Sequence, residues 1–268
     1  MEITSLGFRT DLALLRLGGS LLEDRGDHVA VRTPANPTYR WGNFDLLAAP
    51  PGPDDVAAVL ARYDADLPDA DFRTFGIDGR ALDVDALAPL VAAGPRVESS
   101  AVMTATSVRL PARPNITAQY RTLATDDDWA QRVEMSVAVD AAEAGGDPGY
   151  RAFAEARAEA DRAVCEAGHG AWWGAFEGDR LVASMGLLDA GGGLARFQTV
   201  ETHPDHRGRG LAGTLLHRVA TYGLDATDGL GAHTLVIVAD PDYHALRIYE
   251  SVGLAVTETQ IQLEQRPR

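Results

Sequence analysis

The chain has 268 residues, of which 46% are hydrophobic and 24% are charged. This ordinary globular composition excludes a wholly disordered chain. The formal net charge is −15, from 39 acidic against 24 basic residues, and every basic residue is arginine. We expect no nucleic-acid partner, because phosphates need a basic surface, and no membrane partner, because acidic surfaces bind anionic lipids poorly.

The chain has a single cysteine, Cys165. One cysteine excludes an intrachain disulfide and any metal site built from several cysteines. No apolar run approaches the roughly 20 residues of a membrane span, and we expect no signal peptide from the pattern of the first ten residues. A cytoplasmic location is therefore expected.

The first half of the chain mixes short apolar runs with Pro- and Gly-rich breaks. A stiff connector with two prolines, Leu110–Pro114, separates it from the second half, so we expect domains over 1–110 and 115–268. In the first domain the patterns predict helices and strands in alternation. The helices fall at 11–17, 54–63 and 84–92, and the strands at 28–33, 39–47, 72–77 and 96–106.

The second half has longer and clearer patterns. Helices are predicted over 125–139, 150–167, 210–224 and 242–251, and strands over 117–123, 171–177, 180–188, 194–202, 234–239 and 255–263. Both halves share a similar order of strands and helices. That similarity indicates a duplicated domain whose two copies have diverged.

Glycines and arginines gather where the strand 194–202 meets the helix that starts near Gly210. The run is Arg207-Gly208-Arg209-Gly210-Leu211-Ala212, followed by Gly213 and Thr214. Glycine lets a backbone approach a ligand closely, and the free N–H groups of a helix start attract anions. The two arginines add charge in a planar fork that suits phosphate. The alternative is a glycine-rich turn without a ligand.

This run resembles the R/Q-x-x-G-x-G/A signature of the GNAT superfamily of N-acetyltransferases. Thr202-His203-Pro204 before it resembles the V-x-P that precedes the family's loop. The stretch 242–254 resembles the family's N-x-x-A-x-x-x-Y-x-x-x-G-F helix, with Asp242 in place of asparagine and Leu254 in place of phenylalanine. The resemblance covers about residues 116–263.

The resemblance implies an α/β fold with two GNAT-like domains. The sheet of the C-terminal domain would be mixed, flanked by helices and splayed open between the strands 194–202 and 234–239. Acetyl-CoA would bind in that opening as cosubstrate, and no metal is expected. The implied cofactor-binding residues are Val200 and Thr202 along the pantetheine arm, and Arg207, Gly208, Arg209, Gly210, Leu211, Ala212, Gly213 and Thr214 around the pyrophosphate.

Two residues are candidate catalysts. Tyr249 falls on the family's general-acid tyrosine, which would protonate the departing thiolate; the alternative is a packed helix residue. Glu201 is the best nearby acid for deprotonating an amine, although strand alternation puts it on the face opposite Val200 and Thr202; the alternative is a surface carboxylate. His203 and Asp205 are weaker candidates.

The expected function is N-acetylation of a primary amine by direct transfer. Cys165 is expected to be a small packed residue and not a nucleophile. The acceptor would be a small-molecule or peptide amine, and the assembly could be a homodimer. Two alternatives stay open, namely a non-catalytic module that binds or senses acyl-CoA, and a transferase of a longer acyl group.

The first half lacks a matching phosphate turn. After the strand 39–47 the chain carries Pro50, Pro51 and Pro53 and then Asp54 and Asp55. Each proline removes an amide donor, and the aspartates occupy the helix start where a phosphate would lie. We therefore expect a degenerate GNAT-like domain without cofactor, which would shape the acceptor site or the assembly.

Overall fold

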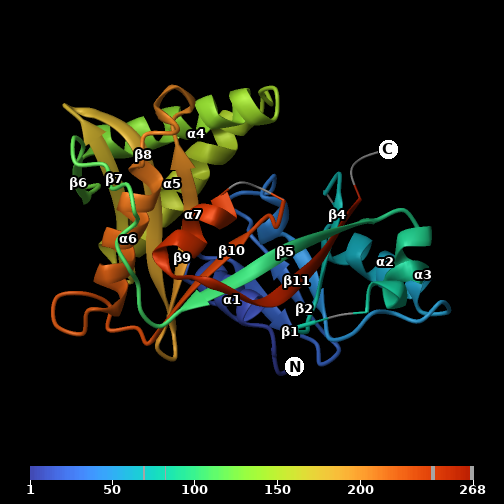
Figure 1. Ribbon diagram of the computed structural model, residues 1–268. Helices are drawn as coiled ribbons and strands as arrows, with labels where there is room; N and C mark the ends of the chain where they lie inside the picture. Colours follow the sequence, from blue (N-terminus) through green and yellow to red (C-terminus); the bar gives the residue numbers. More distant parts are fainter. Residues whose placement is uncertain (69, 82, 243–244, 266–268) are drawn as a thin grey trace. The chain divides into compact units, whose positions relative to one another are not determined.

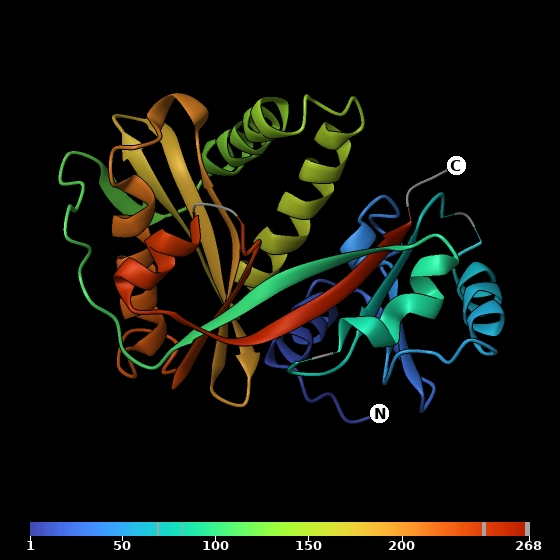
Figure 2. The same ribbon diagram turned by 45° about the vertical axis from the view of Figure 1, so that its right-hand side comes forward.

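The computed structural model describes residues 1–68, 70–81, 83–242 and 245–265. They form two compact units (Figures 1 and 2). Unit 1 comprises residues 1–102, 238–241 and the chain from 256, and unit 2 comprises residues 103–237 and 242–255. Both units combine strands and helices, which confirms the predicted α/β class. Within the described residues, no helix is both long enough and apolar enough to cross a membrane.

Unit 1 contains a mixed sheet with the strand order β1-β2-β3-β4-β11-β5. The pairs β1–β2, β2–β3 and β4–β11 are antiparallel, and the pair β3–β4 is parallel. Strand β11 pairs with β4 and therefore belongs to unit 1. Unit 2 thus differs from the predicted second domain, which ran from 115 to 268 and included this strand. The bounds are β1 (Leu21–Asp24), β2 (His28–Arg32), β3 (Phe44–Leu47), β4 (Arg73–Ile77), β11 (Ala255–Gln265) and β5 (Arg96–Ala105), whose residues up to Val102 belong to unit 1.

Helices cover both faces of this sheet. On one face lies α1 (Leu6–Leu17), which starts before the predicted helix because the Ser5 side chain accepts a hydrogen bond from the N–H of Phe8. On the other lie α2 (Val56–Asp66) and the short pair η2 (Val84–Leu87) and α3 (Ala88–Ala92). Two apolar clusters fill these layers, one around Phe8, Leu12, Leu15, Val31, Phe44 and Leu46, the other around Val59, Tyr63, Phe75, Ile77, Leu90 and Leu263.

The predicted strand over 39–47 is wrong in its first half. Residues Arg40–Gly42 form a 3₁₀ turn, η1, and only β3 is extended. The cause is Asn43, whose side-chain oxygen accepts from the N–H of Thr33 at 2.8 Å while its amide donates to the carbonyl of Tyr39 at 2.8 Å. These bonds fold the backbone into a turn, as asparagine side chains commonly do. The sequence patterns also missed β1.

Unit 2 contains a second run of strands, in the order β10-β9-β8-β7-β6. All neighbours are antiparallel except β9 and β10, which are parallel. The bounds are β6 (Gln119–Thr122), β7 (Gly170–Glu177), β8 (Arg180–Gly191), β9 (Leu194–Thr202) and β10 (Thr234–Ala239), whose residues up to Ile237 belong to unit 2.

Four helices flank the strands of unit 2. On one face lie α4 (Asp126–Glu143) and α5 (Tyr150–Glu166), packed over a core that includes Trp129, Trp172 and Phe176. On the other lie α6 (Leu211–Leu224) and α7 (Ala245–Val252) (Figure 1). The helix predicted from Asp242 is observed from Ala245, and Tyr243 and His244 of the predicted stretch lie outside the described residues.

The two parallel pairs differ at the point where a ligand cleft would form. In unit 2 the described pairing of β9 with β10 stops at Arg196 and Val236, while β9 runs on to Thr202. In unit 1 the pairing of β3 with β4 continues to Leu47 and Ile77, the last residue of each strand, and the N–H of Asp78 bonds the carbonyl of Leu47 at 2.9 Å. The pair in unit 2 therefore opens, as predicted, and the pair in unit 1 stays closed.

Candidate active site

A cavity of about 820 Å³ lies in unit 2 where β9 leaves β10. Its walls come from the end of β9, the turn into α6, α7, the facing ends of α4 and α5, and residues 111–113. Every site residue predicted from the sequence lines it except Thr214. The lining members are Val200, Glu201, Thr202, Arg207, Gly208, Arg209, Gly210, Leu211, Ala212, Gly213 and Tyr249.

A β-bulge interrupts β9 at the cavity. Ser184 of β8 faces Glu201, whereas Gly186, two residues on, faces Gln198, three residues back, so β9 carries one residue more than β8. Thr199 in this gap has φ 45°, the only positive φ of a non-glycine residue in the described chain. A β-branched residue in this region is strained, and such strain gathers at binding sites. Thr199 and Val200 both line the cavity, so backbone released from the ladder borders it.

The turn into α6 is shaped by two glycines in the left-handed region. The short 3₁₀ helix η3 (Pro204–His206) leads to Gly208, with φ 73°, and to Gly210, with φ 75°, which caps α6. A Cβ on Gly208 would meet nothing within 4 Å, whereas one on Gly210 would lie 2.6 Å from the carbonyl oxygen of Arg113. Gly208 therefore leaves open space beside the helix start, and Gly210 lets the connector pack against it.

The connector is held on this turn by two hydrogen-bonding residues. The side-chain amide of Asn115 donates to the carbonyl of Arg209 at 3.0 Å, and its backbone N–H donates to the hydroxyl of Thr214 at 2.8 Å. That hydroxyl in turn donates to the carbonyl of Gly210 at 2.8 Å. Thr214 therefore ties the connector to α6. The sequence predicted an extended connector and gave no sign of this contact.

Both arginines of the turn are paired with acids. Arg207 contacts Glu143 of α4 at 2.7 Å and donates to the carbonyl of Thr202 at 3.2 Å. Arg209 contacts Glu177 through both terminal nitrogens, at 2.5 and 3.1 Å. These side chains are partly exposed, so each pair is weak and an incoming anion can replace the carboxylate.

Glu201 is a half-buried carboxylate beside the bulge. The hydroxyl of Ser136 on α4 donates to its Oε2 at 2.6 Å, so the side chain faces α4. Burial raises the pKa of Glu201, while the Ser136 hydrogen bond and the charge of Arg132 oppose the rise. A carboxylate with a raised pKa is a stronger base, which suits proton abstraction near neutral pH.

A buried ion-pair network lies behind the bulge. Arg132 of α4 contacts Asp161 of α5 at 2.7 Å, and its guanidinium lies 3.8 Å from the ring centre of Trp172. Arg157 contacts the same Asp161 at 3.3 Å and donates to the side chain of Gln198 at 3.1 Å. Gln198 precedes Thr199, so α4 and α5 fix β9 on both sides of the bulge.

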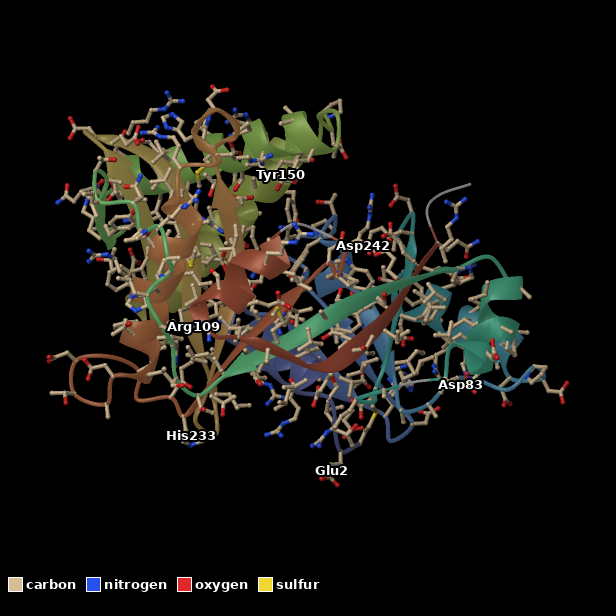
Figure 3. The ribbon with its side chains drawn as sticks, viewed as in Figure 1. Glu2, Asp83, Arg109, Tyr150, His233 and Asp242 are labelled. Carbon is tan, nitrogen blue, oxygen red and sulfur yellow. The ribbon has the colours of Figure 1, made fainter. Side chains whose placement is uncertain are left out.

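Two tyrosines face the cavity from opposite helices. Tyr249 of α7 is 5% exposed. Tyr150 begins α5 (Figure 3), and burial, helped by the charges of Glu201 and Asp140, raises its pKa to about 12. Tyr150 is therefore a neutral phenol that can donate a hydrogen bond. The sequence analysis missed Tyr150, Asp140 and Glu143, because nothing in the helical pattern of α4 and α5 marks these positions.

The weaker candidates lie outside the cavity lining. His203 contacts Asp205 at 3.8 Å and Arg180 at 3.1 Å, and burial lowers the pKa of its imidazole. Cys165 is half-buried in α5, and burial raises the pKa of its thiol to about 12. A thiol with so high a pKa holds little thiolate at neutral pH and is a poor nucleophile.

Comparisons with known proteins agree with this geometry. Residues 137–254 match the model of the acetyltransferase (GNAT) family. A GCN5-related N-acetyltransferase from Kribbella flavida is 15% identical, with 97% of this chain and 96% of that chain covered at a TM-score of 0.63. A conserved protein of unknown function from Staphylococcus epidermidis is 11% identical, with 92% and 93% covered at 0.68.

A tandem GNAT protein of the clavulanic acid biosynthesis pathway is 13% identical, with 94% of this chain and 86% of that chain covered at a TM-score of 0.58. At these identities the solved structures show a shared fold, here over nearly the whole chain. No curated protein matches the chain by sequence.

The raised pKa of Glu201 predicts a pH-dependent effect of Glu201→Gln. Because the folded-state pKa exceeds the unfolded value, parental stability falls as pH rises from below 4.5 through the folded pKa. Glutamine does not ionise, so the variant should be more stable than the parent at pH 7 to 8, with the difference closing near pH 4. Urea unfolding across this range measures it.

Glu134→Gln is the matched control, because Glu134 lies on α4 in an exposed pair with Arg151 that lowers its pKa. This control should show no gain in stability at neutral pH. A Glu201→Gln variant that is less stable than the parent at pH 8 would contradict the raised pKa.

Proposed function

The chain is an acyltransferase with a GNAT-family acetyltransferase domain over residues 137–254, and we propose that this domain transfers acetyl from acetyl-CoA to a primary amine. One observation carries the proposal. The opening of the β9–β10 pair, the bulge at Thr199 and the glycine-rich start of α6 border a single cavity.

The lining residues fit the parts of acetyl-CoA. The pyrophosphate would take the N–H groups of the turn from Arg207 to Ala212, where the helix dipole and two guanidinium groups favour an anion. The pantetheine arm would pair with the β9 backbone near Val200 and Thr202. The described pairing of β9 with β10 ends before these residues, at Arg196. A cavity of about 820 Å³ is within the range of ligand pockets.

The proposed transfer is direct. The lone pair of a neutral amine bonds to the thioester carbonyl carbon, and the carbonyl electron pair moves to oxygen, where a backbone N–H near the bulge would stabilise the charge. When this intermediate collapses, the C–S bond breaks and the phenol of Tyr249 protonates the departing sulfur. Glu201, directly or through water, takes the proton that the amine loses.

The acceptor is proposed to be a cationic amine, either a small molecule or a peptide. The support is electrostatic, because Asp140 and Glu143 line the cavity beside Glu201 and would attract an ammonium group. Acceptor identity, a homodimer and the cytoplasmic location stay predictions.

A screen of free-CoA release over a panel of amines with acetyl-CoA tests the activity, and the same screen with longer acyl-CoA donors tests the acyl length. Acyl-CoA binding without turnover would favour a sensing module.

Tyr249→Phe should retain cofactor affinity and lose turnover. Removing a general acid slows the chemical step, so we expect kcat to fall by about 100-fold or more with the Kd for CoA unchanged. Steady-state kinetics and calorimetry measure the two quantities. Tyr222→Phe is the control, because Tyr222 packs on Trp173 and does not line the cavity. A Tyr249→Phe enzyme that works at the parental rate would remove the proton-donor role.

Glu143→Gln should strengthen CoA binding. The substitution removes the carboxylate that holds Arg207 at 2.7 Å and leaves the guanidinium available to phosphate. An exposed pair contributes about 0.2–1 kcal/mol, which corresponds to a Kd lowered by roughly 1.5- to 5-fold. Glu134→Gln again serves as control, since neither Glu134 nor its partner Arg151 lines the cavity. Equal or weaker CoA binding by Glu143→Gln would show that Arg207 does not meet the phosphates.

Each chain should bind one acetyl-CoA. In unit 1 the β3–β4 pair stays closed and the following residues include Pro50, Pro51 and Pro53, so backbone donors are missing where unit 2 supplies them. Isothermal titration of ligand-free protein gives the stoichiometry. Two sites of comparable affinity would mean that unit 1 binds the cofactor in another way.

A further inference from the structure

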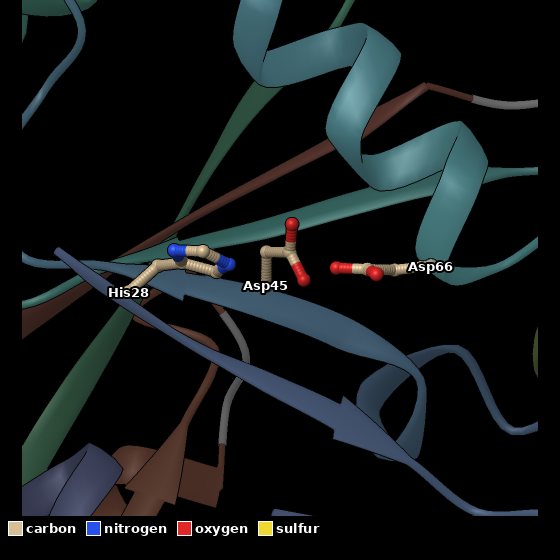
Figure 4. Close-up of side chains that lie close together, drawn as sticks. All are labelled: His28, Asp45 and Asp66. Carbon is tan, nitrogen blue, oxygen red and sulfur yellow. The ribbon is translucent and has the colours of Figure 1, made fainter. Parts of the chain in front are cut away.

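Three polar side chains meet inside unit 1, and none of them lines the cavity of unit 2. They are His28 at the start of β2, Asp45 on β3 and Asp66 at the end of α2 (Figure 4). One nitrogen or oxygen atom from each lies within 4.8 Å of the others. The proposed acyl transfer uses none of them.

Two members of this cluster are buried and have polar atoms without a hydrogen-bond partner. Asp45 is 0% exposed and neither of its carboxylate oxygens has a partner; His28 is 2% exposed and its Nε2 has none. A buried carboxylate without hydrogen bonds is costly, so a positive partner is expected beside it.

The other ring nitrogen of His28 selects the tautomer of a neutral imidazole. Nδ1 lies 2.6 Å from a carboxylate oxygen of Asp27. An ionised carboxylate only accepts hydrogen bonds, so Nδ1 carries the proton and, in a neutral ring, Nε2 carries a lone pair. A lone pair directed towards a carboxylate cluster repels it unless a cation lies between them. Histidines that bind a metal through one ring nitrogen usually donate the N–H of the other ring nitrogen to a carboxylate, as His28 does here.

We propose that His28, Asp45 and Asp66 bind a first-row divalent metal ion, with Zn²⁺ the best match. The ligands would be Nε2 and one oxygen from each carboxylate, and water would take the fourth position. One nitrogen and two carboxylates suit zinc, whereas magnesium and calcium prefer oxygen ligands alone. Two carboxylates also balance the charge of a divalent ion. Tetrahedral ligands about 2.1 Å from zinc lie roughly 3.4 Å apart, so small side-chain rotations would close the observed cluster.

Asp66 is oriented by two arginines, one at each carboxylate oxygen. Arg25 contacts Oδ2 at 2.8 Å and Arg32 contacts Oδ1 at 3.1 Å. Each carboxylate oxygen has a second lone pair, so these contacts position Asp66 and leave acceptor sites for a metal. The Asp66 side chain is 9% exposed, whereas Asp45 is fully buried, so Asp66 is the more exposed of the two carboxylates. The sequence analysis expected no metal. The three members are separated by 17 and 21 residues, so no short motif marks them.

The test is metal binding by the full chain at pH 7.5 after dialysis against EDTA and removal of the chelator. We expect calorimetry to find one Zn²⁺ per chain at this site and the unfolding temperature to rise by about 5 °C at saturating zinc. Co²⁺ in place of zinc should give visible d–d absorption. No rise in unfolding temperature, or a rise without stoichiometric binding, would overturn the proposal.

Two variants assign the binding to these residues. Asp45→Asn keeps the volume and should abolish the zinc-dependent rise, while its stability in EDTA should equal or exceed that of the parent because a buried charge is gone. His28→Gln should abolish the cobalt absorption independently, should Asp45→Asn fail to fold. Asp54→Asn, an exposed acid of unit 1, and His206→Asn, at the cavity of unit 2, are controls that should keep the full shift. A shift retained by Asp45→Asn and His28→Gln, or lost in the controls, would overturn the assignment. The readout needs no acyl transfer, so it stands apart from the proposed activity.

Discussion

The organisation of unit 2 depends on where the parallel pairing of β9 and β10 ends. Pairing stops at Arg196 and Val236, and β9 continues for six residues beyond it. The bulge at Thr199 turns this freed strand and releases backbone polar groups that a continuous ladder would have used. A strained residue persists only where its surroundings hold it, and here the Arg132–Asp161–Arg157 network and the Ser136–Glu201 bond supply that support.

The same constraint explains why two units of related element order differ in what they can bind. In unit 1 the parallel strands stay paired to their ends, so the backbone N–H and C=O groups between them are used in the sheet and are not available to a ligand. The prolines after β3 agree with this, because a segment without N–H donors cannot cradle an anion. The closed pair instead leaves Asp45 on a strand sealed from solvent, where a carboxylate needs a compensating charge.

Local sequence patterns predicted the parts of the site that local geometry determines. The turn from Arg207 to Gly213, Glu201 and Tyr249 were named from spacing and resemblance, and they line one cavity in the structure. The bulge was not predictable in this way, because Thr199 looks like an ordinary strand residue and its φ is set by pairing with β8. The cavity wall formed by Asp140, Glu143 and Tyr150 was also missed, because it depends on where two helices meet the end of β9.

Helical periodicity indicates which side of α4 is buried but not which strand end that side meets. The connector gives a third example, since prolines predicted its stiffness while its contact with Gly210 depends on Asn115 and Thr214, about one hundred residues apart. In unit 1 the 3₁₀ turn at Arg40–Gly42 replaced a predicted strand because one side chain, Asn43, bonded backbone groups from other segments. The connector contact joins segments far apart in the sequence, whereas the Asn43 bonds span four to ten residues. Neither follows from the period of a helix or a strand.

Charge pairing around the cavity links its two proposed ligands. Arg207 and Arg209 are each held by a carboxylate, Glu143 and Glu177, so the turn is nearly neutral on its own. Phosphates that took the arginines would break both of these ion pairs. Glu143 lines the cavity beside Asp140, and without the opposing charge of Arg207 its carboxylate would attract an ammonium group more strongly. On the proposed function, cofactor binding would therefore raise affinity for a cationic acceptor, and by thermodynamic linkage the acceptor would raise affinity for the cofactor equally.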